Sequence, residues 1–401
     1  MGLLKIKFIN VDFMQLFAEK RKVAPFYLRI ENKITQKTLY NKPNSEIENH
    51  KGKHFLIYDI PNYLETKINS KGKNLKSKKI ATYKGFLIQL YKYKSINDYL
   101  NVNSSAKSRS KFRTYQKRLE LCFNIKYEMY FGDISKKKYD YLFNEFKKIL
   151  ERRSIQKHIN NENFDRWDYY YEITYPLILE KKACLFVIYD GDKPINICLN
   201  LTRDQIIFGY IRTFDIDYTK FNIGFIDMIK QIEWAINNNF EIFDLLKGDF
   251  EYKRRWADYI YENESHYIYD SSSLINSLGV RYNAFKTEKY HQILDFLKKR
   301  NLHLLYRKYK IHKYNRAKSN NLDEKKQDYV IDNNLKITSN EKLRKVHLQD
   351  ENYAFLKNPV YHFLYSNFES INDIQISQIV NIPNAYLIEG KNNSQKIIVN
   401  V

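Results

Sequence analysis

Residues 243–258 read FDLLKGDFEYKRRWAD, and this stretch joins the end of a strand, a glycine turn and the start of a charged helix. Residues 240–246 are apolar enough for a buried strand. Gly248 permits a backbone turn that bulkier residues disfavour, and Asp249 suits the N-cap of a helix that runs through Trp256. A strand that ends in such a turn is typical of a ligand site.

Four charged residues follow the end of this strand: Asp244, Lys247, Asp249 and Lys253. In α/β sheets the carboxyl ends of strands open onto the ligand crevice, so we expect these side chains near a bound substrate. The alternative is an ordinary turn with charges on the surface.

The composition predicts a multidomain protein with substantial cores. At 401 residues and 48.6 kDa the chain suits two or three domains, and 43% of its residues are hydrophobic. Cys122, Cys184 and Cys198 form neither a CxxC pair nor an even framework, which favours a reducing cytoplasm. No apolar run approaches the length of a membrane span, and residues 1–10 lack a signal-peptide core, so we expect a cytoplasmic location.

The formal net charge of +22 suggests nucleic acid, anionic lipid or another polyanion as a ligand. Base composition is the alternative explanation, because AT-rich codons favour Lys, Asn, Ile and Tyr together. The 35 tyrosines and 25 phenylalanines are open to the same two interpretations.

The apolar pattern divides the chain into a β-rich beginning and a mixed middle. Residues 1–94 contain short apolar runs, among them KHFLIYDI, which predict strands, and a boundary is expected near Ser95. Helices are predicted over residues 103–120, where one face is basic, and over 136–153 and 167–180.

After residue 180 the sequence changes to runs in which apolar and polar residues alternate. ACLFVIYDGDKPINICLNL predicts a hairpin around Asp190-Gly191, and QIIFGYIRTFD predicts a third strand. Residues 221–239 predict a helix, and Gly224 lies near its start. Free backbone N–H groups at this start could hold a pyrophosphate. The FDLL strand, its turn and a last strand over HYIYD complete this unit.

The C-terminal third begins with a basic segment. Residues 281–318 are predicted to be helical and could lie on an anionic surface or an acidic partner, or simply be a solvated helix. Residues 319–340 are polar and predict a linker, and the apolar runs up to residue 401 predict a small α/β element.

This order of elements resembles the GNAT superfamily, and in particular its CelD/BcsL-type acyltransferases, which are relatives of the FemAB ligases. The resemblance covers roughly residues 95–270. It rests on the basic helix SAKSRSKFRTYQKRLE, on YDGDKPINICLNL through FNIGFIDMIKQIEWAINNNFEIFDLLKG, and above all on the D-x-x-K-G-D-x-x-Y-K-x-x-W pattern of Asp244, Lys247, Gly248, Asp249, Tyr252, Lys253 and Trp256.

The resemblance implies an α/β (α+β) fold, with a mixed, largely antiparallel sheet flanked by helices, and two GNAT-like halves. The expected divisions are a β-rich unit over 1–94, which would be the degenerate half, a GNAT-like domain over 95–285, a basic helical segment over 286–320, and a linker with a small extension over 321–401.

The resemblance also implies transfer of an acyl group from a thioester, either acetyl-CoA or another acyl-CoA, to an amine or hydroxyl of a small or cell-envelope precursor. The expected catalytic residues are Asp244 or Asp249 for the acceptor, Lys253 for an anionic group and Tyr252 for the substrate or leaving group. The backbone of Ile223, Gly224 and Phe225 would hold CoA, and the expected substrate-binding residues are Arg109, Arg113, Lys247, Gly248 and Trp256.

Alternatives stay open at several of these positions. Lys253 could pair with Asp249 along the helix, and Trp256 could belong to the core. FNIGF carries a single glycine where relatives often have a fuller Gly-rich loop, so an acyl carrier protein or aminoacyl-tRNA is an alternative donor. No nucleic acid is required for the expected activity.

No metal site is predicted. The only close histidine pair is His50 and His54, in HKGKH, and Gly52 disfavours the helix that this spacing would need to hold a metal. The competing function is a catalytically inactive GNAT-like module that binds nucleic acid or an anionic membrane through residues 103–118 and 281–318.

Overall fold

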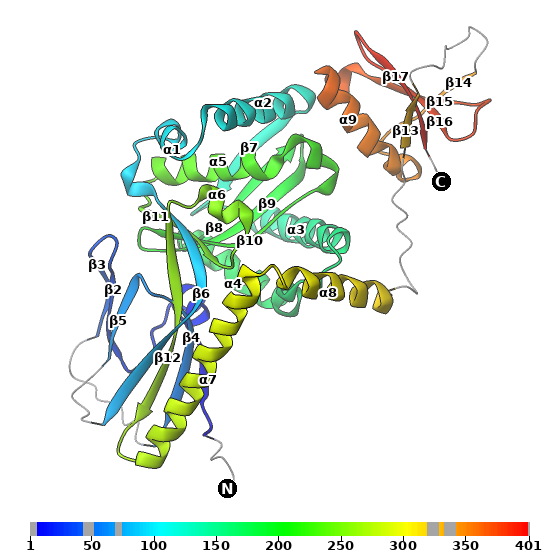
Figure 1. Cartoon of the computed structure of the whole chain (residues 1–401). Coiled ribbons are helices and arrows are strands. Elements are labelled where there is room, and N and C mark those ends of the chain that lie inside the picture. The colour runs from blue at the N-terminus through cyan, green and yellow to red at the C-terminus, as the bar shows by residue number, and fades with distance from the viewer. Residues whose placement is uncertain (1–5, 43–51, 69–73, 319–328, 333–341, 400–401) are drawn as a thin grey trace.

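The computed structural model describes residues 6–42, 52–68, 74–318, 329–332 and 342–399. Its centre is a nine-stranded sheet in the order β1-β4-β12-β6-β11-β10-β9-β8-β7 (Figure 1). The strands of this sheet are β1 (Ile9–Asp12), β4 (His54–Pro61), β6 (Leu75–Gln89), β7 (Ile125–Tyr130), β8 (Ala183–Asp190), β9 (Lys193–Arg203), β10 (Ile206–Phe214), β11 (Ile242–Lys247) and β12 (Tyr259–Asp270).

The sheet is mixed and largely antiparallel, as predicted. The pairs β1/β4 and β10/β11 are parallel, and the other six neighbouring pairs are antiparallel. The predicted hairpin is present as β8 and β9, and its two-residue turn is Gly191-Asp192, where Gly191 has a φ of 59°.

Strands from both sides of residue 95 belong to this one sheet. The long strand β6 pairs with β11 on one side and with β12 on the other, so it joins the β-rich beginning to the rest. A second, three-stranded sheet of β2 (Tyr27–Asn32), β3 (Lys37–Asn41) and β5 (Leu64–Ile68) lies beside it.

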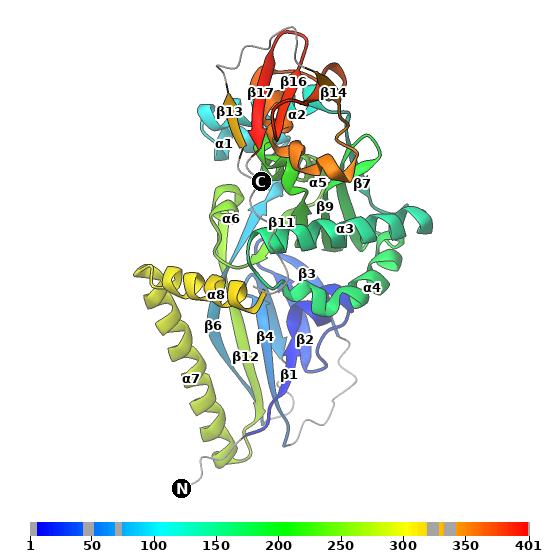
Figure 2. The ribbon, with the colours of Figure 1, turned by 90° about the vertical axis from the view of Figure 1, so that its right-hand side faces the viewer.

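Helices cover both faces of the central sheet (Figures 1 and 2). α3 (Lys136–Gln156) and α4 (Trp167–Leu179) bury apolar residues in one core with β8, β9 and β10. On the opposite face, α1 (Ile96–Asn103), α2 (Ala106–Cys122) and α5 (Ile223–Asn237) share a core with β6 and β11. The three helices predicted over residues 103–180 are therefore confirmed, and Ser105 caps α2.

Short helices connect these elements: η1 (Gln15–Glu19), η2 (Leu90–Lys92), η3 (Glu162–Arg166), η4 (Ile216–Phe221), η5 (Glu351–Leu356), η6 (Ile371–Asp373) and α6 (Glu251–Trp256). The basic segment forms α7 (Leu274–Lys299) and α8 (His303–Lys318). α7 begins seven residues before Arg281, and the division expected at 285/286 lies inside it.

The C-terminal element contains α9 (Lys357–Asn367) and a five-stranded sheet in the order β13-β17-β16-β15-β14. Its strands are β13 (Tyr329–Asp332), β14 (Leu343–Lys345), β15 (Gln375–Ile379), β16 (Ala385–Glu389) and β17 (Ser394–Val399). The predicted small α/β element is present, but the linker prediction is wrong at β13, because Tyr329–Asp332 pairs with β17. The ring of Tyr361 on α9 packs on Phe123 and Tyr218 of the main body.

Candidate active site

The central sheet opens between the parallel strands β10 and β11. They pair only at Ile206–Phe208 with Ile242–Asp244, and both strands become irregular immediately afterwards. Tyr210 is the extra residue of a β-bulge against β9, and β11 breaks its register with β6 between Asp244 and Lys247. Leu246, within that break, has a φ of 62°, a conformation that is unusual for a branched residue. The backbone N–H and C=O groups of Tyr210 and Leu246 therefore lie outside the regular hydrogen-bond ladder of the sheet.

Asp244 lies in the opening and is completely buried. Its carboxylate accepts hydrogen bonds from Tyr63 Oη at 2.7 Å, from Tyr261 Oη at 2.8 and 3.0 Å, and from the backbone N–H of Leu246 at 2.7 Å. Burial raises the pKa of Asp244 to about 6, and these hydrogen bonds and Lys253 oppose the shift. Asp244 is thus a carboxylate whose pKa lies close to neutral pH. The side chains that donate hydrogen bonds to it are those of Tyr63 and Tyr261.

Gly85 on β6 sets the position of Tyr261. A Cβ atom at residue 85 would lie 2.1 Å from the Tyr261 ring, a separation that no packed pair of atoms tolerates. Gly85 pairs directly with Tyr261 in the β6/β12 ladder. Only glycine therefore allows the ring to lie across β6 and reach Asp244.

Lys253 extends from α6 into the same region. Its side chain is buried, and its Nζ donates to the carbonyl oxygens of Leu246 at 3.1 Å and Lys247 at 2.6 Å. Burial lowers the pKa of Lys253 to about 8, although the nearby Asp244 carboxylate raises it. An ammonium has three N–H donors, so one remains for a ligand once these two carbonyls are bound.

Asp249 has a different role from the one predicted. The N-cap of α6 is Phe250, and Asp249 instead binds Arg254 through two 2.5 Å contacts from Nε and Nη2. The N-cap prediction is wrong because this two-pronged pair draws the carboxylate toward the surface. It also means that the partner of Asp249 is Arg254 and not Lys253. Gly248, with a φ of 106°, makes the predicted turn.

A polar cluster lies under α5, on one side of the opening. Asp227 is ion-paired with Arg212 and accepts a hydrogen bond from Asn196 at 2.9 Å, and Gln231 accepts one from Asn200 at 2.8 Å. A narrow cavity of about 20 Å³ beside this cluster is lined by Cys198, Asn200, Gly209, Ile211, Arg212, Gln231, Phe243, Leu245 and Tyr252. Tyr252 lies beside Arg212, whose guanidinium carbon is 5.5 Å from the centre of its ring.

A larger cavity of about 270 Å³ lies on the opposite side of the sheet. Its lining combines charged, amide and tyrosine side chains with apolar ones: Asp12, Met14, Gln15, Glu19, Asp59, Pro61, Asn163, Arg166, Tyr170, Tyr210, Leu246, Lys247, Tyr261 and Asn263. Arg166 pairs with Glu19, and Lys247 pairs with Asp59. Leu245 lines the small cavity and Leu246 the large one, so the two cavities reach the interrupted strands from opposite faces.

The start of α5 lies beside the opening. Ile223 is buried, so only its backbone could contact a ligand, and the N–H of Phe225 donates to the carbonyl of Asn222. A Cβ at Gly224 would be in ordinary contact with Phe214 at 3.5 Å, so this glycine is not required by close packing. The guanidinium carbon of Arg153 lies 3.7 Å from the centre of the Phe214 ring, and among the described residues this guanidinium has no hydrogen-bond acceptor. Arg153 is therefore positioned for an anionic ligand.

Other predicted residues lie elsewhere. Arg109 and Arg113 line a separate groove of about 380 Å³ between α1, α2 and α5. Trp256 is buried in the core against Phe112 and Phe225, as the alternative interpretation expected. The structure thus brings together Asp244, Lys247, Gly248, Tyr252 and Lys253 and leaves Arg109 and Arg113 apart.

His54 is buried in β4, and His50 lies outside the described residues. Within the described ranges, no group of three or more His, Cys, Asp or Glu residues could hold a metal ion. In the same part of the chain, no helix combines the length and apolarity that crossing a membrane requires.

Several residues of the site were not predicted, although some leave a signal in the sequence. Asn196, Cys198 and Asn200 alternate along β9 and so share one face, and Asp227 and Gln231 are four residues apart on an otherwise apolar stripe of α5. Buried polar residues at such spacings indicate a packed polar cluster. Tyr63, Gly85 and Tyr261 leave no local signal, because strand pairing over long distances brings them to Asp244.

Several solved structures and a family model are similar to parts of this chain. Solved structures with related backbones include FemX, at 11% identity and a TM-score of 0.38 over 54% of this chain and 72% of that one. L-PGS from Bacillus licheniformis has 10% identity and a TM-score of 0.35, with 61% and 74% covered, and a GCN5-related N-acetyltransferase from Sphaerobacter thermophilus has 8% and 0.27, with 54% and 60% covered.

A search of curated proteins finds no sequence match. Residues 106–254 match the family model described as the acetyltransferase (GNAT) domain, and this range contains β7–β11, α2–α5 and most of α6. The chain therefore has a GNAT-related fold, and residues 106–254 are the part that is similar to an acetyltransferase (GNAT) domain.

Proposed function

We propose that the protein transfers an acyl group from a thioester, with acyl-CoA as the donor, to an amine or hydroxyl of a small polar acceptor. The observation that carries this proposal is that one cavity lined by Leu245 and another lined by Leu246 flank the parted strands β10 and β11. Asp244 and Lys253 lie beside the same break in β11, where they bind the backbone of Leu246. Two substrates can then approach one point from opposite faces of the sheet, as a transfer reaction requires.

The donor is expected on the α5 side. Arg153 and the positive end of the α5 dipole would attract the phosphates of CoA, and Arg255, whose guanidinium carbon lies 5.0 Å from the Phe225 ring centre, adds a second cation. The thioester would extend past Tyr252 and Arg212 toward Leu245. The small volume there suits a narrow pantetheine arm and means that the side chains must shift when it enters.

The acceptor is expected in the 270 Å³ cavity on the other side. Its carboxylates and tyrosines offer hydrogen-bond acceptors to ammonium and hydroxyl groups, which favours an amino sugar, an amine or a related envelope precursor. Tyr261 lies in the wall of this cavity and also binds Asp244. A small acceptor would therefore touch the tyrosine that leads to the buried carboxylate.

The proposed chemistry uses these contacts in one step of attack and one of departure. The acceptor gives its proton to Tyr261 as Tyr261 gives its own to Asp244, and the freed lone pair attacks the thioester carbonyl. The remaining N–H donor of Lys253 stabilises the negative oxygen of the tetrahedral intermediate. The carbonyl then re-forms as the C–S bond breaks, and Tyr252 protonates the departing thiolate and is reprotonated by solvent. Asp244 returns its proton through Tyr261 to solvent, which restores the carboxylate for the next turnover.

The test is a donor and acceptor screen with the purified full chain. Release of free thiol from acetyl-CoA and longer acyl-CoAs is followed with amines, amino sugars and hydroxyl acceptors, and donor binding is measured by calorimetry. Lys253→Met and Asp244→Asn should abolish turnover and leave donor binding intact, while Asp249→Asn, at a carboxylate that pairs with Arg254, should keep wild-type turnover.

Two outcomes would contradict parts of this proposal. If no acyl-CoA binds or reacts but an aminoacyl-tRNA or an acyl carrier protein does, the donor assignment is wrong and the transfer reaction stands. If no thioester or ester donor reacts at all and the chain binds nucleic acid with strong salt dependence, the enzyme assignment is wrong.

A further inference from the structure

One face of α7 carries large apolar side chains that nothing covers within the described residues. Six of them are between 46% and 65% exposed: Ile275, Leu278, Tyr282, Phe285, Ile293 and Phe296. Along the helix they follow one another at steps of three or four, with Lys289 occupying the place between Phe285 and Ile293. At 3.6 residues per turn these positions form one line, which we call the outer stripe.

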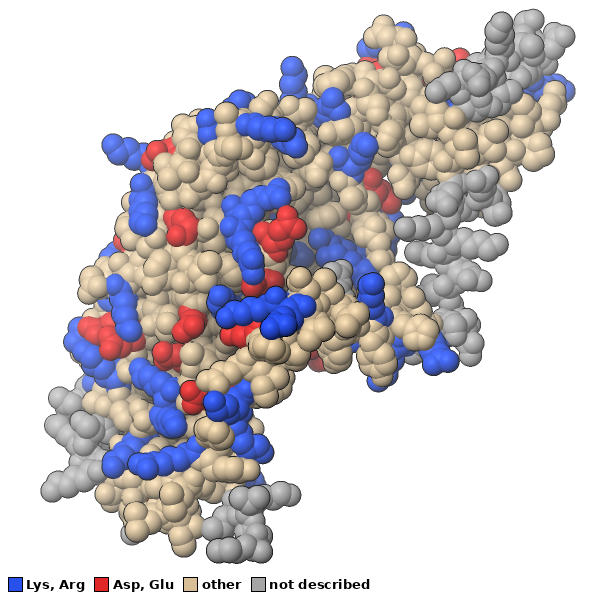
Figure 3. Space-filling view, in the orientation of Figure 1, with Lys and Arg blue, Asp and Glu red and all other residues tan. Residues whose placement is uncertain are grey.

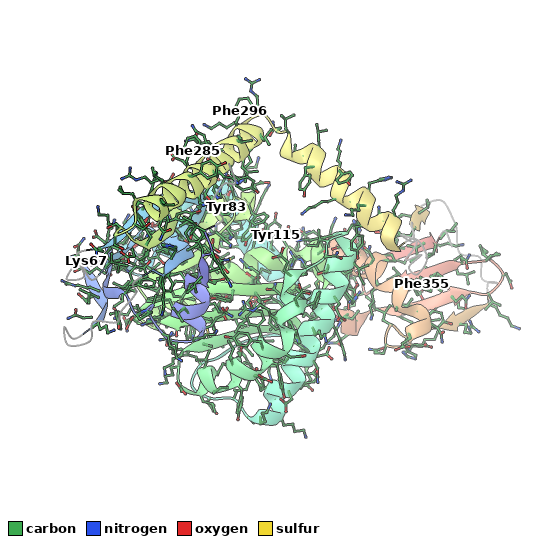
Figure 4. All side chains as sticks on the ribbon, turned by 90° about the horizontal axis from the view of Figure 1, so that it is seen from below. Lys67, Tyr83, Tyr115, Phe285, Phe296 and Phe355 are labelled. Atoms are coloured by element: carbon green, nitrogen blue, oxygen red, sulfur yellow. The ribbon has the colours of Figure 1, made fainter. Side chains whose placement is uncertain are left out.

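The opposite face of α7 packs on the central sheet and fixes the direction of the outer stripe. Val280 and Ala284 are completely buried, the hydroxyls of Thr287 and Tyr267 are 2.6 Å apart, and His291 meets the ring of Tyr83 edge-on at 4.7 Å. Figure 4 shows Phe285 and Phe296 on the side of α7 away from Tyr83. The outer stripe is therefore held away from the body of the protein and cannot turn inward while α7 stays packed.

Cations accompany the aromatic rings of the outer stripe at regular intervals. The residue four positions after each ring is basic and lies against it: Lys286 at 5.7 Å from the Tyr282 ring, Lys289 at 5.5 Å from Phe285, and Arg300 at 5.2 Å from Phe296. In Figure 3, blue Lys and Arg side chains stand among tan ones over the region where α7 lies. Apolar groups flanked by cations are typical of a helix at a membrane surface.

The charges of α7 and α8 indicate what the outer stripe binds. The sequence of α7 has five Lys or Arg and two acidic residues, and that of α8 has six Lys or Arg and none acidic. A second copy would bring these cations against each other, which costs free energy. Nucleic acid would satisfy the cations and leave Leu278, Phe285 and Phe296 exposed to water. An anionic bilayer satisfies both sets of groups, because phosphate headgroups lie directly above apolar chains.

We propose that α7 docks the protein on the surface of an anionic lipid bilayer through its outer stripe, with Lys286, Lys289 and Arg300 on the headgroup phosphates. The helix lies in the plane of the surface and does not cross it. This inference is independent of acyl transfer, because it uses none of the residues between β10 and β11.

The test is sedimentation of the full chain with vesicles, made either of an equal mixture of phosphatidylglycerol and phosphatidylcholine or of phosphatidylcholine alone. Wild type should bind the mixed vesicles, and high salt or omission of phosphatidylglycerol should weaken the binding. Phe285→Ser with Phe296→Ser should weaken it about tenfold or more, because two aromatic rings no longer enter the interface. Both rings are exposed, so the variant should keep its circular dichroism and melting temperature.

Two further variants test what else contributes to vesicle binding. One removes charges of α7, and the other is a control that removes exposed apolar side chains elsewhere on the surface. Lys286→Gln with Lys289→Gln should weaken binding to mixed vesicles and reduce its salt dependence, while Arg300 and the other cations of α7 and α8 keep the remainder. Val102→Ser with Leu179→Ser removes two exposed apolar side chains of α1 and α4 and should leave binding unchanged. The result that would overturn the proposal is vesicle binding that the Phe285/Phe296 variant retains, or that wild type lacks. A dimer in light scattering that this variant abolishes would also overturn it, because the outer stripe would then bind a second copy.

Discussion

Replacement of Asp244 by Asn is expected to make the folded protein more stable at neutral pH and to abolish its activity. Asp244 is fully buried, and its pKa is raised from 3.8 to about 6. The folded state therefore holds the proton more tightly than the unfolded state, and ionisation of Asp244 in the folded protein costs free energy. A shift of this size corresponds to about 3 kcal/mol.

The sign of the pH dependence follows from the two pKa values. Below about pH 4 the carboxyl is neutral in both states, and above about pH 6 it is charged in both, with the cost of burial present in full. In the variant this cost is absent at every pH, while one mismatched hydrogen bond with Tyr63 or Tyr261 costs about 1 kcal/mol. The difference in the free energy of unfolding, variant minus wild type, should thus rise from about −1 kcal/mol near pH 4 to about +2 kcal/mol above pH 6.

Urea unfolding at several pH values between 4 and 8 measures this difference, since the titration of groups that do not interact with Asp244 cancels between the two proteins. The tryptophans at 167, 234 and 256 supply the fluorescence signal, and all three lie in the main body of the chain. Asp249→Asn is the matched control: Arg254 lowers the pKa of Asp249, so that variant should show a small change of the opposite sign. A difference for Asp244→Asn that stays flat from pH 4 to pH 8, or turnover equal to wild type, would refute the reasoning.

Three further predictions concern the same site. Gly85→Ala should displace the Tyr261 ring and lower kcat at least tenfold with little change in the donor KM, which steady-state kinetics can check; an unchanged kcat would remove Tyr261 from the proton path. The pH profile of kcat/KM should be bell-shaped with limbs at about 6 and about 8, because Asp244 must be ionised and Lys253 protonated, and Lys253→Arg should move only the alkaline limb upward. Arg153→Gln should raise the donor KM about tenfold and lower thermal stability only slightly, since within the described residues this guanidinium makes no hydrogen bond and loses only its contact with the Phe214 ring; an equal rise in the acceptor KM would place Arg153 on the wrong side of the site.

Local patterns in the sequence predicted most of the elements, and they are the basis on which the candidate site was placed near Gly248. Alternation in β8 to β10, the apolar stripes of α3 and α5, and the turn at Gly248 depend on neighbours along the chain, so the amino-acid pattern reports them directly. The mixed sheet could also be predicted, because the order of hairpin, strand, helix and strand restricts how these elements can pair.

The contacts of the site could not be predicted in the same way. Tyr63 and Gly85 are more than 150 residues from Asp244, and their approach depends on the register in which β6 lies between β11 and β12. The error at Asp249 has a local cause, because the carboxylate can either cap the helix or bind Arg254, and the two-pronged ion pair prevails. Lys253 lies inward because the irregular backbone at Leu246 and Lys247 offers it two carbonyl oxygens.

The fifteen-residue strand β6 also decides how the protein can be divided. A fragment of residues 106–254 would keep Asp244 and Lys253, but it would leave one edge of β11 without a partner strand and Asp244 without both of its tyrosines. An unpaired edge of this kind promotes aggregation, and a bare buried carboxylate destabilises what remains. The smallest piece that can be expected to fold and react therefore begins before Tyr63 and ends after Tyr261, and any exchange of catalytic domains with a relative has to carry β4, β6 and β12 along.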